Sequence, residues 1–174
     1  MSERSPAEKL LIDFADPGER SRWETVNDRV MGGISQGTIT ISGDKTAIFQ
    51  GLLSLENDGG FASVRTLPRQ FDLAEHDGLL LSVRGDGKTY RVRLRTDDSY
   101  DGVAYQSLFR TEPGVWLTVR LPFSTFVPVF RGMLVPSAPA LDPARVRRIG
   151  FMIADRQEGS FLLEIAWIKA YVER

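Results

Sequence analysis

The chain has 174 residues, of which 42% are hydrophobic and 26% are charged, and its formal net charge is −1. This length fits one domain that can bury a sizeable core, and the near-neutral charge argues against nucleic acid as a partner, because binding to it needs a clear basic excess. The sequence contains no cysteine, which excludes disulfides, thiolate metal sites and a cysteine nucleophile.

We expect residues 1–174 to form a single domain, with residues 1–10 as a flexible N-terminal tail. The segment Met1–Leu11 mixes acidic and basic residues and has no long apolar run, so it is not typical of a signal or transit peptide. No stretch of the chain approaches the roughly 20 apolar residues that span a bilayer. We therefore expect a cytoplasmic protein without a membrane span.

Alternation of apolar and polar residues, interrupted by glycine and proline, is the dominant pattern along the chain. Turn clusters such as Gly85-Asp86-Gly87 separate the alternating segments, and only Glu19–Arg29 suggests a helical turn or two. Short strands at this spacing predict an all-β fold, a two-sheet antiparallel β-sandwich. The expected strands are Thr38–Ser42, Ala47–Leu55, Phe61–Thr66, Gly78–Arg84, Thr89–Thr96, Val103–Arg110, Val115–Leu121, Arg147–Ala154 and Phe161–Tyr171.

The alternation also assigns a face to each side chain, because successive residues of a strand point to opposite sides of the sheet. Apolar residues then share one face, while arginine, serine, threonine and aromatic residues share the other. We expect the core between the sheets to contain Val92, Leu94, Leu117, Val119, Phe151 and Ile165.

Residues suited to catalysis are scarce. His76 is the only histidine, it lies in a polar turn before a strand, and no GxSxG nucleophile motif is present. Zinc catalysis needs several histidine or cysteine ligands. The sequence therefore predicts a protein that is not an enzyme and that needs no cofactor.

Acidic residues offer one alternative to a metal-free protein. Calcium prefers several hard oxygen ligands, and Asp13, Asp16 and Glu164 are the candidates that early and late segments would supply. Glu164 lies among apolar residues of the last strand and needs a partner if it is buried. An arginine would satisfy it as well as calcium would, and no metal is the preferred interpretation.

Three arginines, Arg91, Arg93 and Arg95, share one face of a single strand. Like charges at this spacing repel, so neighbouring groups must offset them. One interpretation is ion pairing across the sheet with Asp97, Asp98 or glutamates. The other is an electropositive groove in which the guanidinium groups and Trp116 or Tyr105 receive an acidic peptide or a sugar.

Several longer motifs occur in a fixed order from about Leu11 to Tyr171, and the first two are specific because they mix many residue types. They are Trp23–Ser35, Glu56–Arg65, Arg84–Tyr90, Trp116–Phe123 with Phe130–Gly132, and Ile149–Phe151 followed by Gly159–Phe161. Together they resemble the complex I intermediate-associated protein 30 family. The resemblance implies a galactose-binding-like jelly roll, a fold shared with many carbohydrate-binding modules. It also implies a role like that of the mitochondrial members, which help to assemble the membrane arm of respiratory complex I, here in a bacterial-type, cytoplasmic relative.

Function is therefore predicted to be non-enzymatic protein binding by an assembly factor or chaperone. The expected partner is a protein client such as an unassembled membrane-complex subunit, and the alternative, which depends on the fold alone, is a carbohydrate-binding module. Binding residues should gather in two glycine-rich loops and on one polar sheet face beside them. The predicted binding residues are Asn27, Asp28, Asn57, Arg65, Arg84, Arg91, Arg93, Arg95, Trp116 and Arg120.

Overall fold

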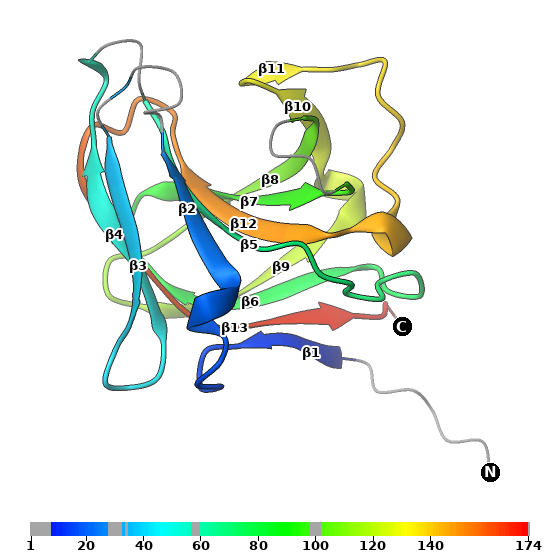
Figure 1. Cartoon of the computed structure of the whole chain (residues 1–174), viewed down its shortest axis with the longest axis horizontal. Helices are drawn as coiled ribbons and strands as arrows, with labels where there is room; N and C mark the ends of the chain where they lie inside the picture. Colours follow the sequence, from blue (N-terminus) through cyan, green and yellow to red (C-terminus); the bar gives the residue numbers. More distant parts are fainter. Residues whose placement is uncertain (1–7, 28–32, 34, 57–59, 98–101, 174) are drawn as a thin grey trace.

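A computed structural model describes residues 8–27, 33, 35–56, 60–97 and 102–173. Its strands form two antiparallel sheets that pack against each other (Figure 1). The strands, in chain order, are β1 (Glu8–Asp13), β2 (Trp23–Asn27), β3 (Gln36–Ile41), β4 (Ala47–Leu53), β5 (Ala62–Thr66), β6 (Gly78–Arg84), β7 (Thr89–Arg95), β8 (Ala104–Arg110), β9 (Trp116–Pro122), β10 (Val127–Phe130), β11 (Met133–Leu134), β12 (Arg148–Ile153) and β13 (Gly159–Tyr171).

The two sheets each have a central strand from the C-terminal part of the chain. The seven-stranded sheet has the order β11-β10-β8-β7-β12-β5-β2, so β12 lies between β7 and β5. The six-stranded sheet has the order β3-β4-β13-β6-β9, and β1 also pairs with β13. Figure 1 shows β12 and β13 as the orange and red strands that cross the middle of the two layers.

The core lies between the sheets and follows the alternation in the sequence. Of the six predicted core residues, the four from β7, β12 and β13 are fully buried, namely Val92, Leu94, Phe151 and Ile165. Leu117 and Val119 are only partly buried against the core. They belong to β9, which is an edge strand and therefore has a neighbouring strand on one side only.

The expected strands form with bounds that differ by a few residues, which confirms the predicted β-sandwich. The helical turns expected over Glu19–Arg29 are wrong for most of that segment. Within its described part, residues 19–27, Arg20–Arg22 forms a 3-10 turn and Trp23–Asn27 is strand β2, paired along its length with β5. The β-branched and aromatic residues of β2 suit a strand that packs one face into the core.

The prediction of a flexible tail over residues 1–10 is wrong for residues 8–10. Residues 8–10 already belong to β1, where Glu8 is opposite Tyr171 and Leu10 is opposite Lys169 of β13. Strands β10 and β11 were also missed, because Pro128 lies inside β10 and proline argues against a strand interior. Pro128 is tolerated here close to the sheet edge, opposite Tyr105 of β8.

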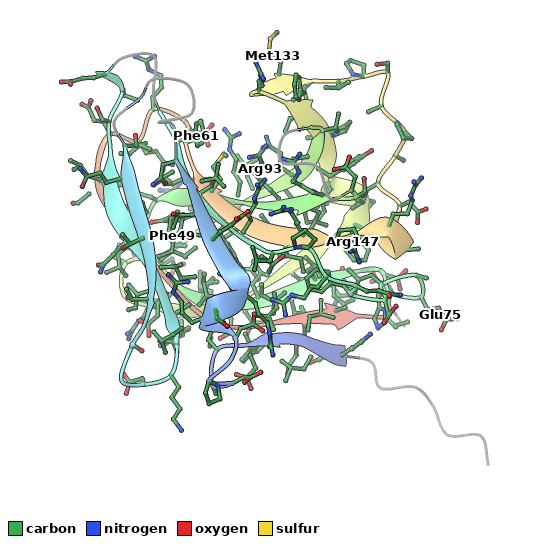
Figure 2. All side chains as sticks on the ribbon, in the orientation of Figure 1. Phe49, Phe61, Glu75, Arg93, Met133 and Arg147 are labelled. Carbon is green, nitrogen blue, oxygen red and sulfur yellow. The ribbon has the colours of Figure 1, made fainter. Side chains whose placement is uncertain are left out.

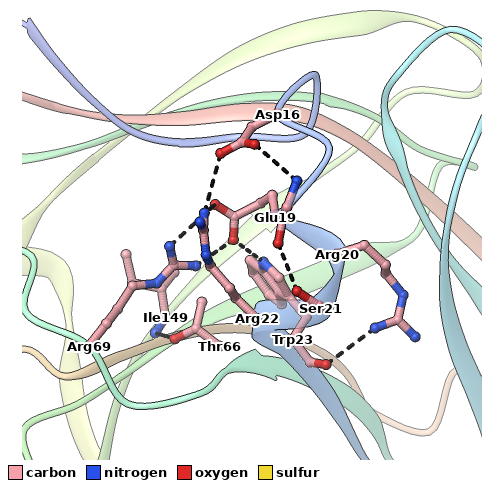
Figure 3. A network of polar contacts seen from close by, with 10 residues as sticks. Asp16, Glu19, Arg20, Ser21, Arg22, Trp23, Thr66, Arg69 and Ile149 are labelled. Carbon is pink, nitrogen blue, oxygen red and sulfur yellow. Dashed lines mark hydrogen bonds and ion pairs between the residues drawn. The ribbon is translucent and has the colours of Figure 1, made fainter.

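A buried ion pair fixes the chain at the start of β2. Glu19 is 2% exposed and accepts hydrogen bonds from Trp23 Nε1 at 2.9 Å and from Arg69 Nη2 at 2.5 Å. Arg22 extends this network to Asp16 at the surface, with Nη1 3.3 Å from Oδ2 (Figure 3). Because Arg69 follows β5, the network ties the β1–β2 connection to the segment after β5. No helix within the described ranges is long and apolar enough to cross a membrane.

Candidate functional site

The outer face of the seven-stranded sheet is hollowed into a pocket of about 540 Å³. We call it the arginine groove, because arginine is the most frequent residue in its lining; these residues are Arg65, Arg91, Arg93, Arg95, Arg131 and Arg148. Among the residues that the structure describes, none that lines the groove is acidic. Figure 2 shows Arg93 on this hollow side of the sheet, below the β10–β11 hairpin that carries Met133.

The strand register explains the shape of the groove. Arg65 of β5 and Arg93 of β7 are both opposite Gly150 of β12, so two arginines stand on either side of a residue without a side chain. A Cβ atom at Gly150 would lie 2.6 Å from the carbonyl oxygen of Val64, too close for a real contact. Glycine is therefore required at this position, and it leaves the space between the side chains of Arg65 and Arg93 free of a side chain from β12.

A second pair of arginines lies two residues away along β12 and β7. Arg148 of β12 is opposite Arg95 of β7, and each is only 7% exposed. In the other direction along β12, Met152 is opposite Ser63 of β5 and contributes an apolar surface to the groove. The groove therefore changes from strongly positive at Arg148 to apolar at Met152.

Glu24 lies at the margin of the groove and binds two of its arginines. Its Oε1 accepts from Arg65 Nε at 2.8 Å and from Arg148 Nη1 at 2.6 Å. Burial disfavours the charged carboxylate, but the two guanidinium groups outweigh this and lower the pKa of Glu24. Glu24 therefore stays ionised and holds Arg65 and Arg148 in place.

Arg91 is held by a different carboxylate. It forms an ion pair with Asp155 and also donates to Gln106 Oε1 at 3.2 Å. Of the acidic partners proposed from the sequence, Asp98 lies outside the described residues. Tyr105, proposed as a groove aromatic, points to the core instead and donates to the carbonyl oxygen of Pro139 at 2.8 Å.

The structure divides the predicted polar face between two sheets. Arg65, Arg91, Arg93 and Arg95 lie together in the groove, but β6 and β9, which carry the other predicted sheet residues, belong to the six-stranded sheet. The prediction of one continuous face is therefore wrong. Alternation identifies which side of its own sheet a residue faces, but it does not identify the sheet.

On the six-stranded sheet the remaining predicted residues have local partners. Arg84 pairs with Glu164, with Nη2 2.6 Å from Oε1, and its guanidinium lies 5.1 Å from the centre of the Trp116 ring. Arg120 lies 3.9 Å from the centre of the Tyr171 ring. Stacked and paired in this way, Arg84 and Arg120 contribute to the surface of their own sheet.

The three candidate calcium ligands do not meet. Glu164 accepts from Thr46 Oγ1 at 2.5 Å as well as from Arg84, so the arginine partner considered from the sequence is the one present. Asp13 accepts from the backbone of Ala15, and the N–H of Gly18 lowers the pKa of Asp16 by bonding its carboxylate. Within the described ranges, no cluster of three acidic or histidine side chains gathers as a metal site requires.

The predicted loop residues are only partly described. Asn27 lies at the end of β2, where its Nδ2 donates to the carbonyl of Gly37 at 3.3 Å, and it does not line the groove. Asp28 and Asn57 lie outside the described residues. His76 lies in the turn before β6, half-buried and away from the groove lining.

Two groove arginines were missed by the sequence reasoning. Arg148 shares a face of β12 with Gly150 and Met152, and this alternation was present in the predicted strand that covers it. Arg131 follows β10, which was not predicted. Both specific motifs of the sequence contribute to the groove, since Val26 comes from the first motif and Phe61 from the second.

Comparison with known proteins gives a family for the sequence. Residues 12–165 match the sequence pattern described as "Complex I intermediate-associated protein 30 (CIA30)". The mitochondrial complex I intermediate-associated protein 30 of Mus musculus is 26% identical over 95% of this chain and 56% of its own length. The protein of the same name from Drosophila melanogaster is 28% identical over 91% of this chain and 61% of its length. The chain thus spans little more than half of these curated relatives.

Solved structures give the fold. A family 11 carbohydrate-binding module from Clostridium thermocellum, in complex with a β-1,3-1,4-mixed-linked tetrasaccharide, superimposes with a TM-score of 0.73. The match covers 97% of this chain and 98% of the module, at 18% sequence identity. This similarity confirms the predicted jelly-roll sandwich and, at such low identity, concerns the fold alone.

Proposed function

Because this chain belongs to the complex I intermediate-associated protein 30 family, we propose that it is a non-enzymatic assembly factor. It acts as a chaperone that binds a protein client, an unassembled subunit of a membrane complex. We further propose that it is a bacterial-type member that works in the cytoplasm. Immunoblotting of cytosolic, membrane, organelle and extracellular fractions tests the location, and a protein found only in an organelle or an extracellular fraction contradicts it.

The arginine groove is the observation that supports a binding role. Its polar lining combines arginines with the neutral side chains Ser63 and Gln106, and no lining residue in the described part of the chain is histidine, aspartate, glutamate or lysine. Arginine remains protonated at all physiological pH values, so it does not exchange protons with a substrate near neutrality. Arginine is instead frequent among residues that dominate protein interfaces.

Affinity capture tests the proposal. The wild-type protein and an Arg93→Gln variant are used to capture proteins from the native cell, and the captured proteins are identified by mass spectrometry. We expect a membrane-complex subunit to be captured by the wild type and to be strongly reduced with Arg93→Gln. The matched control is Arg120→Gln, which removes the same charge from the six-stranded sheet and should leave capture unchanged. Equal capture by both variants would place the client site elsewhere.

Carbohydrate binding is a second candidate, favoured by the fold similarity to a module solved with a bound tetrasaccharide. The exposed aromatic residue expected to stack on a sugar, Trp116, lies on the six-stranded sheet and not in the groove. Isothermal titration calorimetry with the same mixed-linkage tetrasaccharide distinguishes the two functions. Binding of the sugar that Arg93→Gln abolishes and Arg120→Gln preserves would replace the chaperone proposal.

A further inference from the structure

We infer that the arginine groove recognises an extended acidic segment of the client whose sequence pattern is acidic-x-acidic-x-apolar. This inference rests on the function proposed above and names the chemistry of the partner. The segment runs parallel to β12 along the bottom of the arginine groove, which we call the trough. Its pattern follows from the order of side chains that this trough presents.

The trough has three successive levels because every second residue of β12 faces the groove. At the first level Arg148 is opposite Arg95 of β7, and at the second Gly150 lies between Arg65 and Arg93. At the third level Met152 is opposite Arg91 of β7. Neighbouring levels are two residues apart, which is about 6.6 Å along a strand.

An extended peptide has the same repeat as the trough. Its side chains at positions i, i+2 and i+4 point to one side at intervals of about 6.6 Å. Two carboxylates at i and i+2 therefore match the first two levels, where the charge is concentrated. A helical segment would not match, because its side chains at i and i+2 face different directions.

The third level favours an apolar residue. Met152 presents an apolar surface there, and Arg91, which is paired with Asp155, is the one strand arginine at this level, whereas each of the first two levels has two. Val26 of β2 also lines this end of the groove. A third carboxylate would gain little at this level, whereas a branched apolar side chain would bury surface against Met152 and Val26.

Gly150 makes room for the peptide. The arginines on either side of it come from strands separated by two strand spacings, about 10 Å. With no side chain at Gly150, the guanidinium groups of Arg65 and Arg93 can approach a carboxylate in the trough from both sides. Each guanidinium carries five N–H donors, so an arginine that already makes a contact retains donors for another.

Burial of the arginines gives the acidic segment its advantage. Arg95 and Arg148 are each 7% exposed, so they have lost most of their hydration, and Arg148 shares the carboxylate oxygen of Glu24 with Arg65. Arg148 Nε is buried and has no hydrogen-bond partner within the described part of the chain. A carboxylate at the first level would add a second negative charge beside Glu24 and an acceptor for Arg148 Nε.

Fluorescence anisotropy with labelled synthetic peptides tests the inference. The first peptide carries the core Glu-Ser-Glu-Ser-Val between neutral flanks, and the second has the same composition in the order Glu-Glu-Ser-Ser-Val. A third has both glutamates replaced by glutamine, and each sequence is also made in reverse order because the segment can lie in either direction. We expect the alternating peptide to bind at least about tenfold more tightly than the other two, since each loses a charge-assisted contact.

Variants locate the site and separate this inference from the proposed function. Arg93→Gln should weaken binding of the alternating peptide about tenfold or more, whereas Arg120→Gln should leave it unchanged. Equal affinity for the alternating and adjacent peptides overturns the inference, as does tighter binding of inorganic phosphate or the mixed-linkage tetrasaccharide at the same site. If no peptide binds while Arg93-dependent client capture persists, the inference fails and the proposed function stands.

Discussion

The carboxylate of Glu24, on the edge strand β2, positions two arginines of the groove. It binds Arg65 and Arg148 at once, and both arginines also line the groove. Without it, two guanidinium groups that are nearly buried would lose the carboxylate that they share. Glu24 therefore controls both the stability of β2 on β5 and the arrangement of the groove.

The lowered pKa of Glu24 makes stability depend on pH. Because the folded-state pKa lies below the ordinary value of 4.5, the carboxylate stabilises the protein fully above that ordinary value. This stabilisation is lost as the pH falls through the lower, folded-state pKa. We expect Glu24→Gln to lower the free energy of unfolding at neutral pH and to flatten its decline in acid. Urea unfolding at a series of pH values measures both effects, and parallel curves for the two proteins would contradict the prediction.

The buried ion pair at the start of β2 gives a second prediction. Replacing Glu19 by alanine leaves Arg69 charged and largely buried without its partner and removes the acceptor of Trp23 Nε1. We expect Glu19→Ala to lower the free energy of unfolding by about 3–5 kcal/mol. The control is Arg22→Ala, which removes the longer contact of Glu19 with Arg22 but keeps the 2.5 Å pair with Arg69. Arg22 and Asp16 are both 49% exposed, and such an exposed pair contributes about 1 kcal/mol or less. Urea unfolding of the variants is the measurement, and equal losses would show that the burial of Glu19 is unimportant.

At the scale of whole elements, β12 is the strand that gives the groove its floor. It pairs with β5 and β7, and at Gly150 the backbone of β5 leaves no space for a Cβ atom. A side chain there would both fill the trough and push β5 away. The shape of the binding surface and the packing of the sheet therefore depend on the same residue.

Gly150→Ala should consequently destabilise the fold. The new Cβ would meet the carbonyl oxygen of Val64 at 2.6 Å, and relief of such a clash by a backbone shift typically costs about 1–3 kcal/mol. Gly43→Ala is the matched control, because a Cβ at Gly43 would meet nothing within 4 Å, and its effect should stay within about 0.5 kcal/mol. Thermal unfolding compares them, and a neutral Gly150→Ala would mean that β5 and β12 separate more easily than their register suggests.

Period-two alternation was sufficient to predict most strands and the faces of their residues. It failed for β2, where Glu19–Arg29 mixes charged residues at spacings that also suit a helix, and for β10, where Pro128 argues against a strand. In both cases tertiary pairing determines the outcome, with β2 held by β5 and β10 held by β8. Local patterns do not contain that information.

The candidate site was predictable to the same degree. The row Arg91, Arg93 and Arg95 and its neighbour Arg65 were found from the sequence, because alternation placed them opposite the core. Arg84 and Trp116 were wrongly joined to them. The pairing of distant segments, such as β6 with β13, determines which strands share a sheet. Alternation within one strand gives no information about this pairing.

At the scale of the whole molecule, charge is unevenly distributed. The net charge of the chain is −1, yet the described residues that line the groove include six arginines and no acidic residue. The attraction for the proposed acidic segment is therefore local to one face. Because the whole chain has a net charge of −1, the residues outside the groove lining carry a net negative charge.

Salt should weaken client binding through this local field. Raising sodium chloride from about 0.1 M to about 1 M shortens the screening length from about 10 Å to about 3 Å. We expect the dissociation constant of the alternating acidic peptide to rise steadily over this range for the wild type, and less steeply for Arg93→Gln. Anisotropy titrations at several salt concentrations provide the measurement, and an affinity insensitive to salt would indicate that apolar contacts dominate.

The position of β12 and β13 in the chain has a consequence for how the protein is made. Each sheet contains a strand that is synthesised after the strands it pairs with. In one sheet β12 pairs with β5 and β7, and in the other β13 pairs with β1, β4 and β6. Until residue 171 has been synthesised, several earlier strands have open edges that can pair with the wrong partner. Folding should therefore be slow, and it should not be completed before β13 has been synthesised, as expected when contacts join distant parts of a chain. A protein that would assist the assembly of others is, during its own synthesis, vulnerable to misassembly.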